Sequence, residues 1–95
     1  MDEPVPLPHY RITDHAKMEM QRRQIDETDV ARALHHPGQV VRVRSGHIIY
    51  QSKIRLGNPS KDYLLRVVIA IGQEPPAVVT VYRTSKVDKY WRENE

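Results

Sequence analysis

Apolar and polar positions follow two different periodicities along the 95-residue chain, and the change comes near residue 38. Before that point apolar residues recur every three or four positions, as they do along one side of an α-helix. After it they alternate with polar residues or form short continuous runs, as they do in β-strands. The pattern predicts one domain over residues 1–95, with a helical part over residues 10–36 and a sheet over residues 39–84.

The first helix is predicted to begin at Thr13, which is a favourable N-cap residue, and to run to about Gln24. His15 and Arg22 lie seven positions apart, so they share one side of this helix. From the sequence alone, the polar stretch around Arg22 could either bend one long helix or end the first of two.

A second helix is predicted after this stretch, with Asp26 or Thr28 as its N-cap. Acidic residues in its first turn interact favourably with the positive end of the helix dipole. Pro37-Gly38 ends it. Residues 1–9 contain three of the seven prolines, so we expect an extended arm there.

Four strands are predicted in the sheet part, because β-prone segments are separated there by short turns and loops. They cover residues 39–44, 47–54, 63–71 and 77–84. Short connections favour hairpins, so we expect an α+β domain in which two helices pack on a four-stranded antiparallel meander. The tail, residues 85–95, could add a short helix or a last edge strand, with Trp91 folding back on the sheet.

Composition narrows the possible functions. The chain has no cysteine, which excludes disulfides, thiol catalysis and zinc–thiolate sites. Its net charge is +3, and ten of its fifteen cationic residues are arginine, a residue whose planar fork matches phosphate. The charge alone is therefore compatible with contact to RNA or another phosphodiester, and equally with no anionic partner.

The sequence also argues against several sites and locations. It has no signal-peptide pattern, and its longest apolar run, Val67 to Ile71, is far too short to span a bilayer. We expect a soluble, cytoplasmic protein without a membrane partner. No phosphate-binding loop, dinucleotide fingerprint, zinc-protease pattern or nucleophile elbow is present, so we expect no metal and no cofactor.

Polar residues interrupt the two most strand-like segments of the chain. Arg66 lies inside the third predicted strand, and Thr80 and Tyr82 lie two positions apart on one side of the fourth. Metal-free RNA cleavage needs proton transfer at the 2′-hydroxyl and at the leaving oxygen, together with positive charge on the phosphate. His15 suits the proton transfers, Arg66 the phosphate, and the two hydroxyls can donate to its oxygens.

These four residues are the predicted catalytic group, with further polar residues around them as substrate-binding candidates. The candidates are Arg22, Arg83, Lys86 and His47. Each catalytic residue also has a purely structural interpretation. His15 could be solvated, Arg66 could form a salt bridge with Asp62, Glu74 or a helix carboxylate, and Thr80 and Tyr82 are good strand formers.

Several short motifs, in their order and spacing, resemble a bacterial family known as domain of unknown function 4258. The residues that carry the resemblance are Ile12-Thr-Asp-His15-Ala, Met18, Arg22 and Ile25, then Val30, Leu34 and Pro37, then Leu65-Arg66-Val-Val and Val79-Thr80-Val-Tyr82. The family has been grouped with the small metal-independent ribonucleases of the barnase–EndoU–colicin–RelE superfamily, in which helices precede a four-stranded antiparallel sheet.

The resemblance implies a ribonuclease of toxin type, with RNA as substrate and an antitoxin or immunity protein as partner. It also implies that His15, Arg66, Thr80 and Tyr82 form the active site. No second histidine matches the pattern of EndoU-like enzymes, with His47 the nearest candidate, which favours assistance by arginine and tyrosine. The alternative is a non-catalytic module that binds RNA or a protein partner with the same basic surface.

Overall fold

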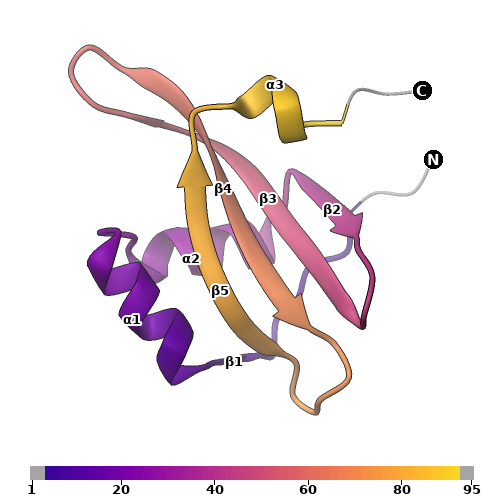
Figure 1. Cartoon of the computed structure of the whole chain (residues 1–95). Helices are drawn as coiled ribbons and strands as arrows, with labels where there is room; N and C mark the ends of the chain where they lie inside the picture. The colour runs from indigo at the N-terminus through magenta and orange to yellow at the C-terminus, as the bar shows by residue number, and fades with distance from the viewer. Residues whose placement is uncertain (1–3, 93–95) are drawn as a thin grey trace.

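The computed structural model describes residues 4–92, in which three helices accompany a five-stranded sheet. The elements are β1 (Arg11–Ile12), α1 (Asp14–Arg22), α2 (Glu27–His35), β2 (Gln39–Arg42), β3 (His47–Leu56), β4 (Lys61–Ala70), β5 (Ala77–Thr84) and α3 (Val87–Tyr90). The strand order is β1-β5-β4-β3-β2. In Figure 1, α2 lies behind the sheet and α1 lies beside β5, whereas α3 lies at the upper end of the sheet.

The α+β class is confirmed, and β2 to β5 form the predicted antiparallel meander. The sheet is nevertheless mixed, with five strands instead of four, because β1 pairs with β5 in parallel. Arg11 donates its backbone N–H to Pro76 at 3.0 Å, and Thr13 donates to Val78 at 3.1 Å. The helical part predicted over residues 10–36 did not include this strand, because a two-residue strand is too short to show alternation.

Local backbone chemistry ends α1 at Arg22 and so separates the two N-terminal helices. Gln24 adopts a left-handed conformation with φ 56°, and its N–H bonds to the carbonyl of Gln21 at 3.2 Å. The N–H of Ile25 bonds back to Met20 at 2.8 Å, which completes a Schellman motif. Ile25 is itself buried in the core, so the turn is held by packing as well as by hydrogen bonds.

The predicted helix N-caps are found at the expected positions. The Thr13 hydroxyl accepts the N–H of Ala16 at 3.1 Å and so satisfies one of the free donors of α1. Asp26 is the N-cap of α2, although its side chain makes no capping hydrogen bond. The second helix ends at His35, just before Pro37.

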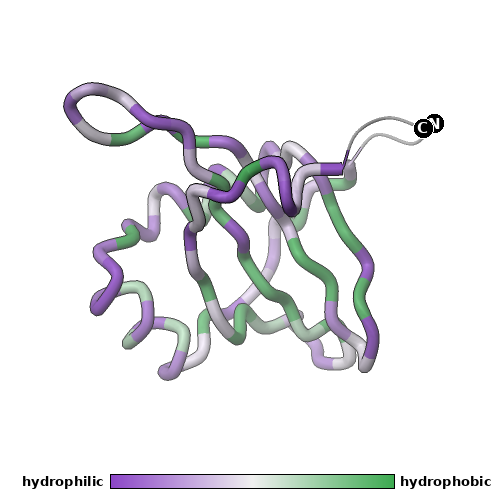
Figure 2. Tube along the Cα trace, turned by 45° about the horizontal axis from the view of Figure 1, so that its top comes forward, coloured by the Kyte–Doolittle hydropathy of each residue, from purple (hydrophilic) through white to green (hydrophobic). Residues whose placement is uncertain are grey.

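The hairpin of β3 and β4 is longer than predicted. Pairing continues to Leu56 and Lys61, so only residues 57–60 of the expected loop over residues 55–61 remain a turn. Arg55 forms an ion pair with Asp62 at 3.3 Å. Figure 1 shows this hairpin projecting from the body of the domain, and Figure 2 shows that its tip is mostly hydrophilic. This end of the hairpin is held by cross-strand hydrogen bonds, and its side chains stay exposed. Its residues can therefore be as hydrophilic as those of a loop.

The core lies between the two N-terminal helices and one side of the sheet. Leu34 of α2 and Ala16 of α1 are fully buried there against β4 and β5. From the strands, Leu65, Val67 and Ile69 of β4 and Val78 and Val81 of β5 complete the cluster. These alternate positions of β4 face the helices, so the positions between them, including Arg66, face away.

We predict that Leu34→Ala lowers the free energy of unfolding by about 2–5 kcal/mol, because it leaves a cavity in a core that cannot fully collapse. The matched control is Met18→Ala on α1, since Met18 is 65% exposed and its loss should change stability by less than about 0.5 kcal/mol. Chemical denaturation of both variants measures the difference. Equal effects would contradict the assignment of the core.

Tyr50 of β3 connects the core to the arm. Its side chain is only 4% exposed, and its hydroxyl donates to the carbonyl of Val5 at 2.9 Å. Burial raises the pKa of the Tyr50 hydroxyl, because the phenolate is poorly solvated there. The folded state therefore holds this proton more tightly than the unfolded state does.

We predict that the stabilising effect of the Tyr50 hydroxyl is present at neutral pH and is lost as the pH rises above about 10. The unfolded chain ionises at a lower pH than the folded one, so alkali favours unfolding. Urea denaturation of the natural protein and of Tyr50→Phe, compared at several pH values, measures this. A stability difference that stays constant through this range would contradict the prediction.

Candidate functional site

Arg66 lies in the middle of the sheet, on the side that faces away from α1 and α2. The register pairs it with Gln51 of β3 and with Tyr82 of β5, so these three side chains share one side. Arg66 is only 7% exposed, although it carries a charge. A buried charge is costly unless its donors are satisfied, so its surroundings define the site.

Two neutral groups accept hydrogen bonds from the guanidinium of Arg66. Its Nε donates to Oε1 of Gln51 at 2.9 Å, and its Nη1 donates to the hydroxyl of Tyr82 at 2.7 Å. The Tyr90 ring covers it, with its centroid 4.3 Å from the guanidinium carbon. Among residues 4–92 no carboxylate lies within 4 Å of Arg66, and Nη2 has no hydrogen-bond partner. The salt bridge with Asp62 or Glu74 that the sequence allowed is absent there.

The segment after β5 closes over this arginine through polar contacts. Gln51 donates its Nε2 to the carbonyl of Tyr90 at 3.1 Å and to Oε1 of Gln39 at 2.8 Å. The Gln39 amide in turn bonds both the N–H, at 3.0 Å, and the carbonyl of Arg92. The described part of the tail thus contains a short helix, and two glutamines of the sheet hold its last residue and Arg92.

Trp91 folds back on the sheet, as the sequence predicted. Its ring lies against Gly38, and a Cβ placed on Gly38 would be 2.9 Å from Cη2 of Trp91. Lys53 of β3 places its Nζ 4.3 Å from the centroid of the Trp91 ring. Gly38, the residue directly before β2, therefore allows the Trp91 ring to approach the backbone closely.

His15 does not lie beside Arg66. It is exposed in the first turn of α1, and α1 packs its buried residues, Ala16 and Met20, on the side of the sheet that carries Val81. Arg66 faces the other side, so the sheet itself separates the two side chains. The predicted four-residue group is thus divided: Arg66 and Tyr82 are in contact, and His15 belongs to another surface.

Thr80 and His47 share the side of Arg66 without touching its guanidinium. Thr80 is paired with Val68 and is half-buried two positions from Tyr82. His47 lies four residues from Gln51 along β3, which places it about 13 Å away along the strand. Thr80 therefore adjoins the site, whereas His47 is too distant to act in it.

The helix layer carries a separate cluster around Glu19. Arg22 bonds its carboxylate at 2.5 Å and Arg23 at 2.9 Å. The hydrogen bond from Arg22 is the main cause of a lowered pKa at Glu19, with further contributions from the charges of Arg22, Arg23 and His15. Arg22 is therefore engaged in an ion pair on α1, away from the side of the sheet where it was expected to bind substrate.

Arg83 lies at the outer edge of β5, next to the site. It donates to the carbonyl of Gln24 at 3.3 Å, while Arg23 donates to the carbonyl of Val81 at 2.8 Å. Together with Tyr82, the two arginines line a hollow of about 430 Å³. Lys86, the last predicted binding residue, is exposed just before α3.

Sequence reasoning missed the glutamines and the aromatic cover. Gln51 interrupts a strand as Arg66 does, and this polar position inside a strand was the available signal. Gln39 is the first residue of β2 and gave no such signal. Their contact depends on the register of β2, β3 and β4, which neighbouring residues along the chain do not specify. Tyr90 reaches the guanidinium only because the tail crosses the sheet.

A family model described as Domain of unknown function (DUF4258) matches residues 12–83, which include both N-terminal helices, Arg66 and Tyr82. The chain belongs to the DUF4258 family. Among curated proteins and among solved structures, the same comparisons found no significant match.

The match of this DUF4258 chain ends at residue 83, so Tyr90, which covers Arg66, and Trp91 lie beyond it. Within residues 4–92 of this DUF4258 chain, no set of three or more His, Asp or Glu side chains could hold a metal ion. No helix in that part is long and apolar enough to cross a membrane.

We predict that Gly38→Ala displaces Trp91, because the new methyl group would also lie 3.0 Å from the carbonyl oxygen of Gln51. Overpacking of this kind costs about 1–3 kcal/mol. Trp91 is the only tryptophan, so a shift of fluorescence emission to longer wavelength reports its exposure. Gly72→Ala is the control, since no atom lies within 4 Å of its added Cβ. An unchanged spectrum in Gly38→Ala would contradict the proposed packing.

Proposed function

We propose that this DUF4258 domain binds single-stranded RNA on the side of the sheet that faces away from α1 and α2. One observation carries the proposal. Arg66 is held in place by Gln51 and Tyr82, has no carboxylate within 4 Å among residues 4–92, and leaves Nη2 without a partner there. A preorganised guanidinium with only neutral partners suits a phosphate oxygen.

Aromatic residues beside the arginine support a nucleic-acid ligand. Tyr82, Tyr90 and Trp91 are partly exposed on this side of the sheet. Bases of single strands stack on such rings, while cationic groups contact the backbone. Arg83 at the β5 edge adds positive charge next to Tyr82, whereas Arg23 in the same hollow is paired with Glu19. A mixed aromatic and basic surface is thus available around one fixed guanidinium.

A second candidate is RNA cleavage, as in the ribonuclease superfamily that the family resembles. The observation that favours it is the hydrogen bond from Arg66 to Tyr82. A hydroxyl that accepts from a guanidinium must direct its own proton elsewhere, so Tyr82 could donate to the phosphate or to the leaving oxygen. His15 has no part in this version, because the sheet separates it from Arg66.

The test measures binding of a fluorescently labelled single-stranded RNA by anisotropy, with EDTA present. We expect Arg66→Gln to weaken binding about tenfold or more, the effect of losing a charged hydrogen bond. His15→Ala should leave the affinity unchanged. Arg32→Gln is the control for loss of charge alone, since Arg32 is exposed on α2 and pairs with Asp29 at 3.6 Å. Thermal unfolding checks that each variant is folded.

Product analysis on the same samples separates binding from cleavage. If cleavage occurs, Tyr82→Phe should abolish it while RNA binding persists, because the ring stays and Gln51 still holds Arg66. Equal affinity of Arg66→Gln and the natural protein would contradict the binding proposal. Tight association with a partner protein, without affinity for RNA, would favour a protein-interaction module instead.

A further inference from the structure

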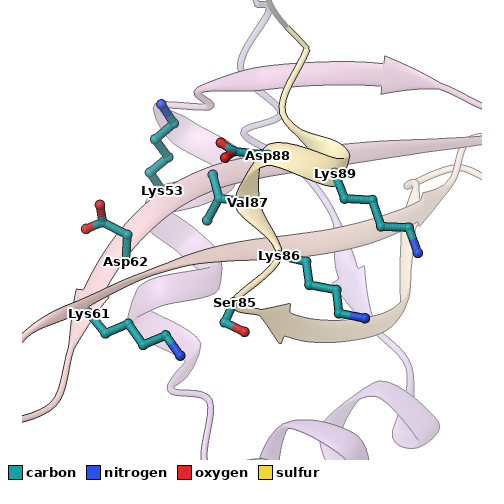
Figure 3. Close-up of a pocket in the computed structure, with 8 residues that line it drawn as sticks. All are labelled: Lys53, Lys61, Asp62, Ser85, Lys86, Val87, Asp88 and Lys89. Carbon is teal, nitrogen blue, oxygen red and sulfur yellow. The ribbon is translucent and has the colours of Figure 1, made fainter.

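A cleft of about 550 Å³ lies between the β3–β4 hairpin and α3. Four lysines line it, with two acidic residues beside them. The lysines are Lys53, Lys61, Lys86 and Lys89, and the acids are Asp62 and Asp88. Figure 3 shows that they come from β3, from β4 and from the segment that includes α3, so distant parts of the chain build one basic surface.

The positive charge of the cleft is largely uncompensated. Every ion pair within 4 Å in the described part of the chain uses an arginine, and none uses a lysine. Asp62 is already paired with Arg55 at 3.3 Å, which removes one of the two acidic charges. The four ammonium groups therefore face solvent with Asp88 as the remaining carboxylate at the cleft.

The cleft continues the surface around Arg66. Lys53 lies two positions after Gln51 on β3, so both side chains share one side of the sheet. Lys53 stacks on Trp91, and Lys89 lies 5.3 Å from the centroid of Tyr90, the ring that covers Arg66. Aromatic rings thus lie between the guanidinium of Arg66 and the ammonium groups of the cleft.

We propose that this cleft binds consecutive phosphates of the same single-stranded RNA, as an extension of the Arg66 site. The inference rests on the proposed function, and it assigns the course of the RNA beyond Arg66. Ammonium groups act as point charges for phosphate, whereas the guanidinium of Arg66 sets a single geometry. The RNA backbone then runs from the sheet across α3 to the hairpin.

A chain of phosphates fits the cleft better than a single anion. In Figure 3, Lys86 and Lys89 extend to one side of α3, Lys61 reaches toward Ser85, and Lys53 lies apart from them. Side chains that spread in this way do not converge on one phosphate, but they can contact successive phosphates of a strand. The neighbouring aromatic rings favour nucleotides over an acidic peptide, because bases can stack on them.

The experiment measures the affinity of the full chain for a labelled single-stranded RNA over a range of salt concentrations. The double variant Lys61→Gln/Lys86→Gln removes two exposed cleft charges. We expect a roughly tenfold weaker affinity and a salt slope that is smaller by about 0.7 for each lost phosphate contact. The control is Lys17→Gln on α1, which removes an exposed charge on the other side of the sheet.

The outcomes separate this inference from the proposed function. If Arg66→Gln weakens binding while the double lysine variant keeps the affinity and salt slope of the natural protein, the cleft is not part of the interface. If the double lysine variant has a weaker affinity for the RNA and Arg66→Gln does not, the cleft binds RNA and the proposed Arg66 site is wrong. Competition by polyglutamate as strong as that by unlabelled RNA would overturn the assignment to phosphates. Circular dichroism checks that the variants are folded.

Discussion

A guanidinium in the middle strand of the sheet is the constraint on which the rest of this surface depends. Arg66 cannot be buried at low cost unless acceptors reach it, and Gln51 and Tyr82 do so from the two neighbouring strands. Both contacts require one particular register on each side of β4. A shift by one residue would turn these side chains toward the helices and leave the charge without partners.

The sheet therefore divides the domain into two surfaces with different roles. The helix side holds the apolar core, and at its rim the carboxylate of Glu19 occupies Arg22 and Arg23. The other side holds Arg66 with neutral partners, the aromatic cover and the lysine cleft. Arginines paired with a carboxylate are poor sites for a further anion, so the charge available to the proposed RNA ligand lies mainly on the second side.

Much of the fold could be predicted because its signals are local. Thr13 caps a helix through its own hydroxyl, and alternation along each strand identifies the side that faces the core. The sequence did not predict two features of the fold. The strand at Arg11 and Ile12 is defined only by its pairing with β5, and the extension of the hairpin to Leu56 and Lys61 depends on cross-strand hydrogen bonds. Neither requires a hydrophobic pattern.

The candidate site shows the same division between local and long-range information. The sequence by itself determined that Arg66, Thr80 and Tyr82 interrupt β-strands, since strand periodicity depends on nearest neighbours. Only the tertiary structure decided that Arg66 contacts Tyr82, that Tyr90 covers it, and that His15 lies beyond the sheet. The physical reason is that strand register and the side on which a helix packs are set by contacts between residues far apart in the chain.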